Sequence, residues 1–240
     1  MKFKYLALFT AAFLLISASV MGQMDFGMGA PDMNQPVAEV NDVEITLQEL
    51  EQRAGVQQLV MQLQQMNPQF AGFLLQSEAG REFLFEYRRE LLEEELIPME
   101  LLRQKADEEG IVVTEEQEDE YYAQIEEQLE MQREQQGLSE EEFLQQINQN
   151  IPDEDIQTSD DLKKLILRDA DLKVEILLEE HVLGETDEEL DQEALQQQQL
   201  QQREDFENYL ADLKEDAEIV IHEEVLRDID DSAAGMPFGF

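Results

Sequence analysis

The sequence predicts a mainly α fold of the α+β class, in which helices form most of the chain and a small sheet joins an N-terminal hairpin to a C-terminal strand. Two observations predict it. Apolar side chains recur at spacings of three and four along most of the chain, which is the pattern of amphipathic helices. Residues 37–45 and 219–221 are instead β-prone runs near the two ends. Because an isolated hairpin is only marginally stable, we expect the second run to pair with the first.

The first of these runs, VAEVNDVEI (residues 37–45), alternates about Asn41 and Asp42. Both residues tolerate positive φ, so they can form the two-residue turn of a hairpin. This turn fixes the register, and the four apolar side chains beside it then point to one side. The expected partners are Val40 with Val43 and Ala38 with Ile45.

Four helices are predicted to begin at a capping box, in which a Ser or Thr is followed three residues later by Glu or Gln. Each side chain of the pair accepts a hydrogen bond from the backbone amide of the other, which closes the first turn. The expected helices are residues 47–54 after Thr46 with Glu49, 115–136 after Thr114 with Gln117, a helix from 140 after Ser139 with Glu142, and 187–213 after Thr186 with Glu189.

A long amphipathic helix is predicted over residues 82–109. Its apolar residues recur at helical spacing, and acidic and basic residues fill most other positions. Pro98 lacks the amide hydrogen that the helix ladder needs, so we expect a bend there. Gly110 ends the helix, because glycine adopts the left-handed conformation at low cost.

Two other segments are helical by their spacing. Residues 56–85 carry more apolar side chains than one stripe requires, and we expect one or two helices with breaks at Asn67-Pro68 and Gly72. Residues 160–183 trace most of an apolar stripe, so one helix is expected there, ended by Gly184.

Several of these pieces together resemble the SurA-type chaperone module, which SurA, PrsA and PpiD share. The resemblance is carried by the hairpin and first helix (37–50), by GLSEEEF (137–143) and by the closing helix and strand (209–224). Its core signature is similar to Leu96-Ile97, Leu101-Leu102, Ala106, Gly110-Ile111, Val113-Thr114 and Glu116.

The resemblance implies an ATP-independent chaperone that holds unfolded or newly exported envelope proteins, outer-membrane proteins among them. The relatives carry a parvulin prolyl-isomerase domain, but only residues 185–187 separate the two helices where it would be inserted. We therefore expect a chaperone module without that domain. Two alternatives stay open: a prolyl-isomerase family member, and a structural adaptor that binds one fixed partner.

The N-terminus predicts export to the periplasm. Lys2 and Lys4 precede an apolar run, and small residues follow, so residues 1–22 are expected to be a signal peptide cleaved near Gly22/Gln23. An uncleaved anchor is the alternative. After cleavage we expect no stable membrane insertion. The remaining predicted boundaries are a disordered leader over 23–36, a SurA-like domain over 37–227 and a disordered acidic tail over 228–240.

The charge of the chain limits its partners. Its 58 acidic residues against 16 basic ones give a formal net charge of −42. Binding to nucleic acid begins with Lys and Arg at phosphates, so nucleic acid is not an expected partner. Salt screens the self-repulsion of such a chain, and we hypothesise a high-salt habitat. The alternative is a surface acidic enough to maintain solubility or to attract basic clients.

The residues that carry catalysis or hold cofactors are scarce. The chain has no Cys, and its two histidines, His181 and His222, are far apart and outside any metal-binding spacing. No glycine-rich phosphate loop is present. We therefore expect no enzyme activity, no cofactor and no metal.

Flexible and aromatic apolar side chains are the candidates for client binding, because they repack around clients of varied shape. Ordinary packing in a core is the alternative for each of them. The long helices are also compatible with a homodimer. The predicted client-binding residues are Met61, Met66, Phe70, Phe73, Phe83, Tyr121, Tyr122 and Phe143.

Overall fold

The structure is a computed structural model that describes residues 32–150, 156–169, 171–183 and 192–229. The chain divides into two compact units. We call residues 25–101 with 210–240 the sheet unit, and residues 102–209 the helical unit. The helical unit is thus inserted in sequence between two parts of the sheet unit. The predicted mainly α fold with a small sheet is confirmed.

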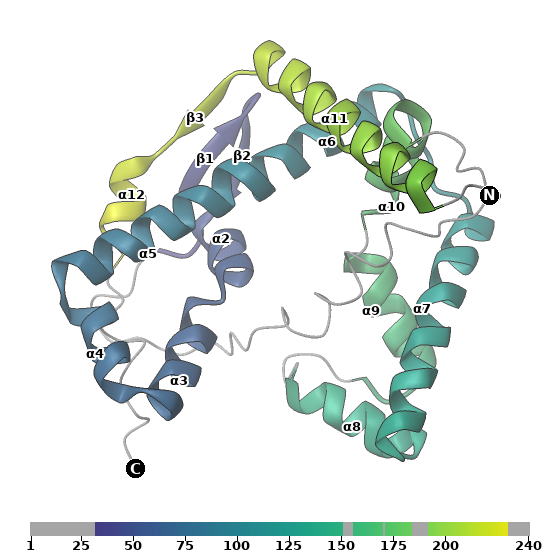
Figure 1. Cartoon of the computed structure of the whole chain (residues 1–240), viewed down its shortest axis with the longest axis horizontal. Coiled ribbons are helices and arrows are strands. Elements are labelled where there is room, and N and C mark those ends of the chain that lie inside the picture. The colour runs from purple at the N-terminus through teal and green to yellow at the C-terminus, as the bar shows by residue number, and fades with distance from the viewer. Residues whose placement is uncertain (1–31, 151–155, 170, 184–191, 230–240) are drawn as a thin grey trace. The chain divides into compact units, whose positions relative to one another are not determined.

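Three antiparallel strands form the sheet, in the order β2-β1-β3 (Figure 1). They are β1 (Pro36–Val40), β2 (Val43–Thr46) and β3 (Ile219–Ile221). The two ends of the described chain therefore meet in one sheet, as predicted, and β1 is the central strand. Both neighbours of β1 are needed to pair its backbone groups, because a two-stranded hairpin alone is marginal in water.

The turn of the hairpin has the predicted conformation and register. Asn41 and Asp42 have φ of 50° and 69°, which are the positive values that a two-residue turn requires. Val40 pairs with Val43, and Ala38 pairs with Ile45. Val43 remains 42% exposed, so it does not join the other three in the core.

Backbone and side-chain hydrogen bonds join the hairpin to the C-terminal strand. The amide of Asn41 donates to the carbonyl of Glu218 at 2.9 Å, and the amide of Glu218 donates to Oδ1 of Asn41 at 2.8 Å. At the other end of the strand pair, the amide of His222 donates to the carbonyl of Val37 at 2.9 Å. The ring of His222 also lies 3.0 Å from Oε1 of Glu39.

Helices of the sheet unit differ from the prediction between residues 56 and 85. Three helices are present where one or two were expected, and Gly72 lies inside one of them. The breaks are at Asn67 and Ser77, whose side-chain oxygens accept from the amides of Phe70 at 3.1 Å and Gly80 at 2.9 Å. The helices are α2 (Leu47–Ala54), α3 (Val56–Met66), α4 (Pro68–Gln76) and α5 (Glu78–Leu91).

Gly80 allows α4 and α5 to approach closely at this break. A Cβ atom built on Gly80 would lie 2.1 Å from the carbonyl oxygen of Leu74, which is backbone and cannot swing away. A Cβ atom on Gly72 would meet nothing within 4 Å. Close packing of α4 against α5 therefore requires a glycine at position 80 but not at position 72.

Gly80→Ala should lower the free energy of unfolding by about 2 kcal/mol or more, because the backbone of α4 must shift to admit the methyl group. The matched substitution Gly72→Ala should instead raise it by roughly 0.5–1 kcal/mol, since alanine is the better helix former. Urea unfolding followed by circular dichroism measures both. Equal effects of the two substitutions would contradict the packing role of Gly80.

A bend was predicted at Pro98, and a π-helical turn, η1 (Leu92–Leu96), lies just before it, between α5 and α6 (Ile97–Glu108). The ring of a proline crowds the carbonyl four residues before it, which here is that of Glu94. A π turn widens the helix at this place, and the amide of Ile97 donates to the carbonyl of Leu92.

A buried ion pair links α5 to α2 in the sheet unit. The side chain of Arg88 is only 2% exposed, and its Nε donates to Oε1 of Glu51, whose side chain is 12% exposed. Around the pair lie two apolar clusters. One contains Val37, Val40, Leu47, Leu50, Phe85, Leu92 and Leu226, and the other contains Ala54, Val56, Val60, Leu74, Leu75 and Leu84.

The helical unit begins as the capping signals predict. Gly110 and Gly137 end α6 and α7 with φ of 72° and 67°. The capping boxes of Thr114 and Ser139 are both formed, and so is that of Thr46 in the sheet unit. The elements are α7 (Glu115–Gln136), α8 (Glu140–Asn150), α9 (Ser159–Asp169), α10 (Leu172–Leu178), the π-helical turn η2 (Glu179–Leu183) and α11 (Gln192–Asp216).

The prediction of a single helix over residues 160–183 is wrong, because α9 and α10 are separate helices. Asp171 precedes α10 with a non-helical ψ of 59°, and its carboxylate accepts from Nε of Arg103 at 2.5 Å. This ion pair joins α10 to α6. The spacing of apolar residues within the segment does not predict it, because Arg103 is far away in the sequence.

Some predictions fall on residues outside the described ranges. They are the signal peptide, most of the leader, the capping box at Thr186, the stop at Gly184 and most of the tail. Among the described residues, no helix has both the length and the apolar character required to span a bilayer.

Candidate functional site

The structure divides the eight predicted client-binding side chains into two groups. Five are exposed and belong to the sheet unit, with exposed fractions from 46% for Phe70 to 81% for Met66. Three are buried and belong to the helical unit. The exposed group is Met61, Met66, Phe70, Phe73 and Phe83, and the buried group is Tyr121, Tyr122 and Phe143.

The buried group forms part of a core, which favours the alternative of ordinary packing for these three residues. Tyr121 is 2% exposed, and all three pack in one cluster with Ile125, Leu144 and other apolar residues. The hydroxyl of Tyr122 donates to the carbonyl of Ser159 at 3.4 Å. These contacts stabilise α7 against α8 and α9, and they leave the three side chains little surface for a client.

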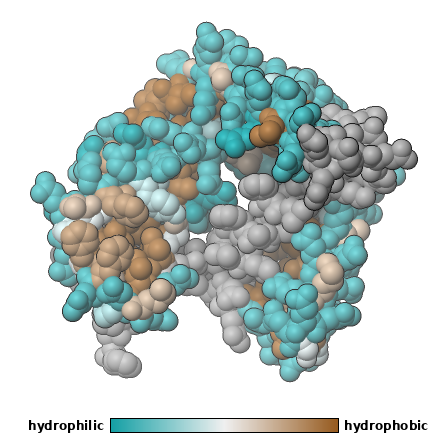
Figure 2. All heavy atoms as spheres, viewed as in Figure 1, coloured by the Kyte–Doolittle hydropathy of each residue, from teal (hydrophilic) through white to brown (hydrophobic). Residues whose placement is uncertain are grey.

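The exposed group lies on consecutive helices. Met61 and Met66 are on α3, Phe70 and Phe73 are on α4, and Phe83 is on α5. We call these five side chains the α3–α5 surface. Figure 2 shows apolar side chains gathered over α3 and α4, on the face turned to the viewer. Exposed apolar patches of this kind mark interaction sites in soluble proteins.

Two faces of α4 are apolar, which explains why some of its rings remain outside. Leu74 and Leu75 are buried in the cluster beneath, so they anchor the helix. Phe70 and Phe73 are one turn apart on another face, with ring centroids 6.3 Å apart in a stacked arrangement. An amphipathic surface helix needs only the first set for packing.

Charge is missing from this part of the chain. Residues 54–77 contain no Asp, Glu, Lys or Arg, although 31% of the whole chain is charged. The segment covers α3 and α4 completely. A client segment docking there would desolvate no ion on these two helices, which keeps the cost of apolar binding low. This uncharged stretch is the sequence feature that distinguishes the exposed Phe70 from the buried Phe143.

Tyr87 is a member of the site that sequence reasoning did not single out. Its ring stacks on that of Phe83 with a centroid distance of 6.5 Å and an interplanar angle of 2°. Its hydroxyl donates to the carbonyl of Ala54 at 3.0 Å, which holds α5 to the end of α2. Burial, followed by the carboxylate of Glu95, raises the pKa of Tyr87, so the hydroxyl keeps its proton.

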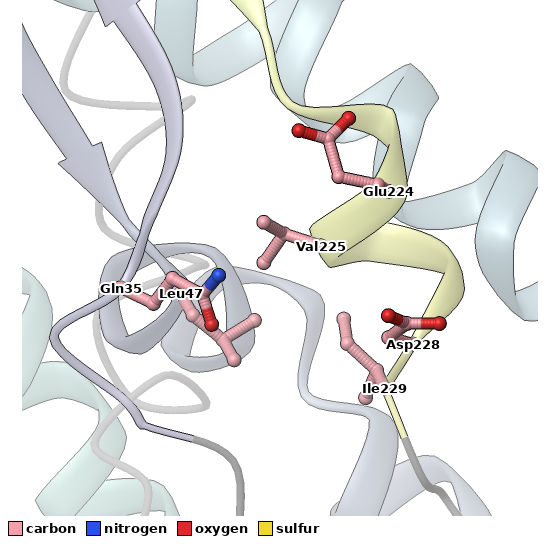
Figure 3. Close-up of a pocket in the computed structure, with 6 residues that line it drawn as sticks. All are labelled: Gln35, Leu47, Glu224, Val225, Asp228 and Ile229. Atoms are coloured by element: carbon pink, nitrogen blue, oxygen red, sulfur yellow. The ribbon is translucent and has the colours of Figure 1, made fainter.

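A small pocket of the sheet unit is a weaker candidate (Figure 3). Its volume is about 230 Å³, and both apolar and acidic side chains line it. Ligand pockets are usually about 300–1,000 Å³ and mostly apolar. The lining residues are Gln35, Leu47, Glu224, Val225, Asp228 and Ile229.

One exposed cluster of the helical unit contains possible metal ligands. One ligand atom from each of Glu109, Glu180 and His181 lies within 4.8 Å of the others. Glu109 already binds His181 at 2.7 Å and Lys105 at 3.3 Å, and the hydrogen bond from His181 lowers the pKa of Glu109. The second histidine, His222, belongs to the sheet unit. Glu109 is thus engaged by His181 and Lys105.

A buried carboxyl group lies in the helical unit. Glu175 on α10 is 6% exposed, and its Oε2 has no hydrogen-bond partner within the described part of the chain. Burial raises its pKa to about 7, with Glu179 and Asp171 contributing in the same direction. Four neighbours on the same helix are buried apolar residues: Leu172, Val174, Leu177 and Leu178.

The described chain is thus a mainly helical fold with a small sheet, in which five Met and Phe side chains of the sheet unit are exposed. Residues 2–157 match the SurA-like N-terminal domain. This match covers more than half of the chain, and the chain belongs to that family. The family is periplasmic and is a non-catalytic chaperone module. No curated protein and no solved structure matches the chain.

Proposed function

We propose that this protein is an ATP-independent periplasmic chaperone that holds unfolded or newly exported envelope proteins on its α3–α5 surface. The single observation that carries the proposal is the exposure of five Met and Phe side chains, four of which lie on α3 and α4, two helices without charged residues. Membership of a chaperone-type family supports the same reading of that surface.

The chemistry of the surface suits clients of varied sequence. Phe rings supply large apolar contact areas, and the unbranched Met61 and Met66 can repack around different partners. A surface with no charged residue on α3 and α4 selects for exposed apolar segments and not for one sequence. Folded proteins rarely display such segments, so a client would leave once it had buried them.

The acidity of the rest of the chain has a second effect. A complex that carries the net charge of −42 repels other complexes, which opposes their association into aggregates. The chaperone therefore contributes solubility as well as cover for apolar segments.

Replacing Phe70 and Phe73 together by Ala should weaken client binding by about 2 kcal/mol, which is roughly thirtyfold in Kd, because each ring acts as a central apolar contact. The measurement is suppression of aggregation of an unfolded outer-membrane barrel protein diluted into molar salt. Phe70→Ala with Phe73→Ala should require correspondingly more chaperone for half protection.

The matched control is Met131→Ala with Leu200→Ala. These side chains are 50% and 67% exposed on α7 and α11, so the control removes similar exposed apolar area away from the α3–α5 surface. It should protect the client as the wild type does. Circular dichroism melting should be unchanged in both variants, since none of the four residues is buried. Equal protection by the Phe variant and the wild type would remove the α3–α5 surface from the proposal.

A further inference from the structure

The described chain ends next to one helix of the α3–α5 surface. α12 (Glu223–Arg227) packs on α5, with the guanidinium of Arg227 3.8 Å from the ring centroid of Phe85. Nη1 of Arg227 also donates to Oε2 of Glu82 at 3.4 Å, and Glu82 directly precedes Phe83. Figure 1 shows α12 beside the first half of α5, with α4 at the end of that helix. The last described residue follows Arg227 by two positions.

The residues that follow are unusually apolar for this chain. After Asp230 and Asp231, the sequence SAAGMPFGF (232–240) contains no charged residue. It ends with two phenylalanines separated by one glycine. A chain with 58 acidic residues thus carries a further uncharged apolar segment shortly after α12, the helix that packs on α5.

The length of this segment is sufficient for it to reach the α3–α5 surface. From Ile229 to Met236 the chain can span roughly 20–25 Å at about 3.3–3.6 Å per residue. A helix with its side chains is about 10–12 Å across, so the segment can cross α5 and reach α4.

Attachment to the same chain also favours this occupant over a second copy. Two chains of net charge −42 repel each other on approach. A segment on a short flexible connection instead has an effective concentration of the order of millimolar at its own surface. Weak contacts by two rings and one Met are then enough for substantial occupancy.

We propose that residues 236–240 dock on the α3–α5 surface of their own chain and must be displaced by a client. The inference rests on the proposed function, because it names the occupant of the same surface when no client is bound. Phe238 and Phe240 supply the rings, and Met61 or Met66 adapts to them. Clients then bind with an apparent Kd raised by the fraction of molecules in which the surface is covered.

Phe238→Ser with Phe240→Ser in the full chain should make the surface freely available. Nile red, an uncharged apolar dye, should bind this variant about two- to tenfold more tightly than the wild type. The matched control is Met131→Ser, which removes an exposed apolar side chain outside the surface and should leave dye binding unchanged. Unchanged dye binding by the tail variant would overturn the proposal.

A second measurement identifies which chain supplies the segment. Because the sequence has no cysteine, Ala234→Cys can carry a single spin label. The methyl signals of Met61 and Met66 should broaden in the labelled chain, and the broadening should disappear when Phe238 and Phe240 are also replaced by Ser. Broadening seen only when spin-labelled chains are mixed with separate methyl-labelled chains would assign the surface to a second copy and overturn the proposal.

The two proposals fail in different ways. If the tail is not the occupant, dye binding and methyl signals are indifferent to Phe238 and Phe240, while Phe70→Ala with Phe73→Ala still loses client protection. If the surface does not bind clients, that Phe variant protects them fully whatever the tail does.

Discussion

Arg88→Met is expected to lower the free energy of unfolding by about 3–5 kcal/mol. The substitution removes one partner of a buried ion pair and leaves the carboxylate of Glu51, 12% exposed, without its main countercharge. Methionine is similar in length and apolar, so lost packing contributes less than the unpaired charge. Urea unfolding followed by circular dichroism gives the change directly.

A neighbouring arginine provides the control for Arg88. Arg89 is on the same helix, 36% exposed, and its ion pairs with Glu86 and Glu93 are both 3.4 Å long. Exposed pairs contribute little, so Arg89→Met should change the free energy of unfolding by less than about 0.5–1 kcal/mol. A double variant, Arg88→Met with Glu51→Gln, should recover part of the loss because no buried charge remains. An Arg88→Met protein as stable as the Arg89→Met protein would show that the pair is not buried in solution.

Glu175→Gln is expected to stabilise the helical unit above pH 7 by roughly 3 kcal/mol, since each pKa unit corresponds to about 1.4 kcal/mol. The folded-state pKa is about 7, above the ordinary 4.5 of the unfolded chain. Below pH 4.5 both states hold the proton and nothing is lost. Between pH 4.5 and 7 the unfolded chain releases the proton while the folded chain keeps it, so stability falls as pH rises.

The measurement is urea unfolding of wild type and Glu175→Gln at pH 5 and at pH 8. The difference between the two proteins should be several times larger at pH 8, where the wild type must bury a charge. Glu127→Gln removes an exposed carboxyl of α7 in the same unit and should change the free energy of unfolding little at either pH. A difference independent of pH would contradict the burial of Glu175.

Local signals in the sequence predicted much of the fold. Asn41 and Asp42 determine the hairpin register because a two-residue turn leaves one pairing, and the capping boxes at Thr46, Thr114 and Ser139 begin helices through bonds three residues apart. The pairing of β3 with β1 followed from the lack of another partner for the hairpin. Contacts between residues far apart in the sequence were not predictable: Arg103 on α6 contacts Asp171, which directly precedes α10, across 68 residues.

The exposure of the candidate client-binding side chains could be predicted only in part, for a related reason. Helical spacing places Phe73 and Phe143 on apolar faces alike, but it does not say which face another helix will cover. Phe143 is covered because α7, α8 and α9 converge on it, and Asn148 on α8 fixes the start of the next segment through bonds to Ile156 at 2.6 and 3.0 Å. The absence of charge over residues 54–77 distinguishes the exposed pair, and it is visible in the sequence.

The central position of β1 imposes an order on the formation of the sheet in each chain. Its partner β3 lies some 180 residues later, so at about 5–20 residues per second the ribosome supplies the two strands roughly 10–40 s apart. Until the second strand arrives, the hairpin has one unpaired edge and the helices of the sheet unit lack their closing layer. The sheet is therefore complete only after almost the whole described chain has been synthesised, although its first two strands are among the first residues made.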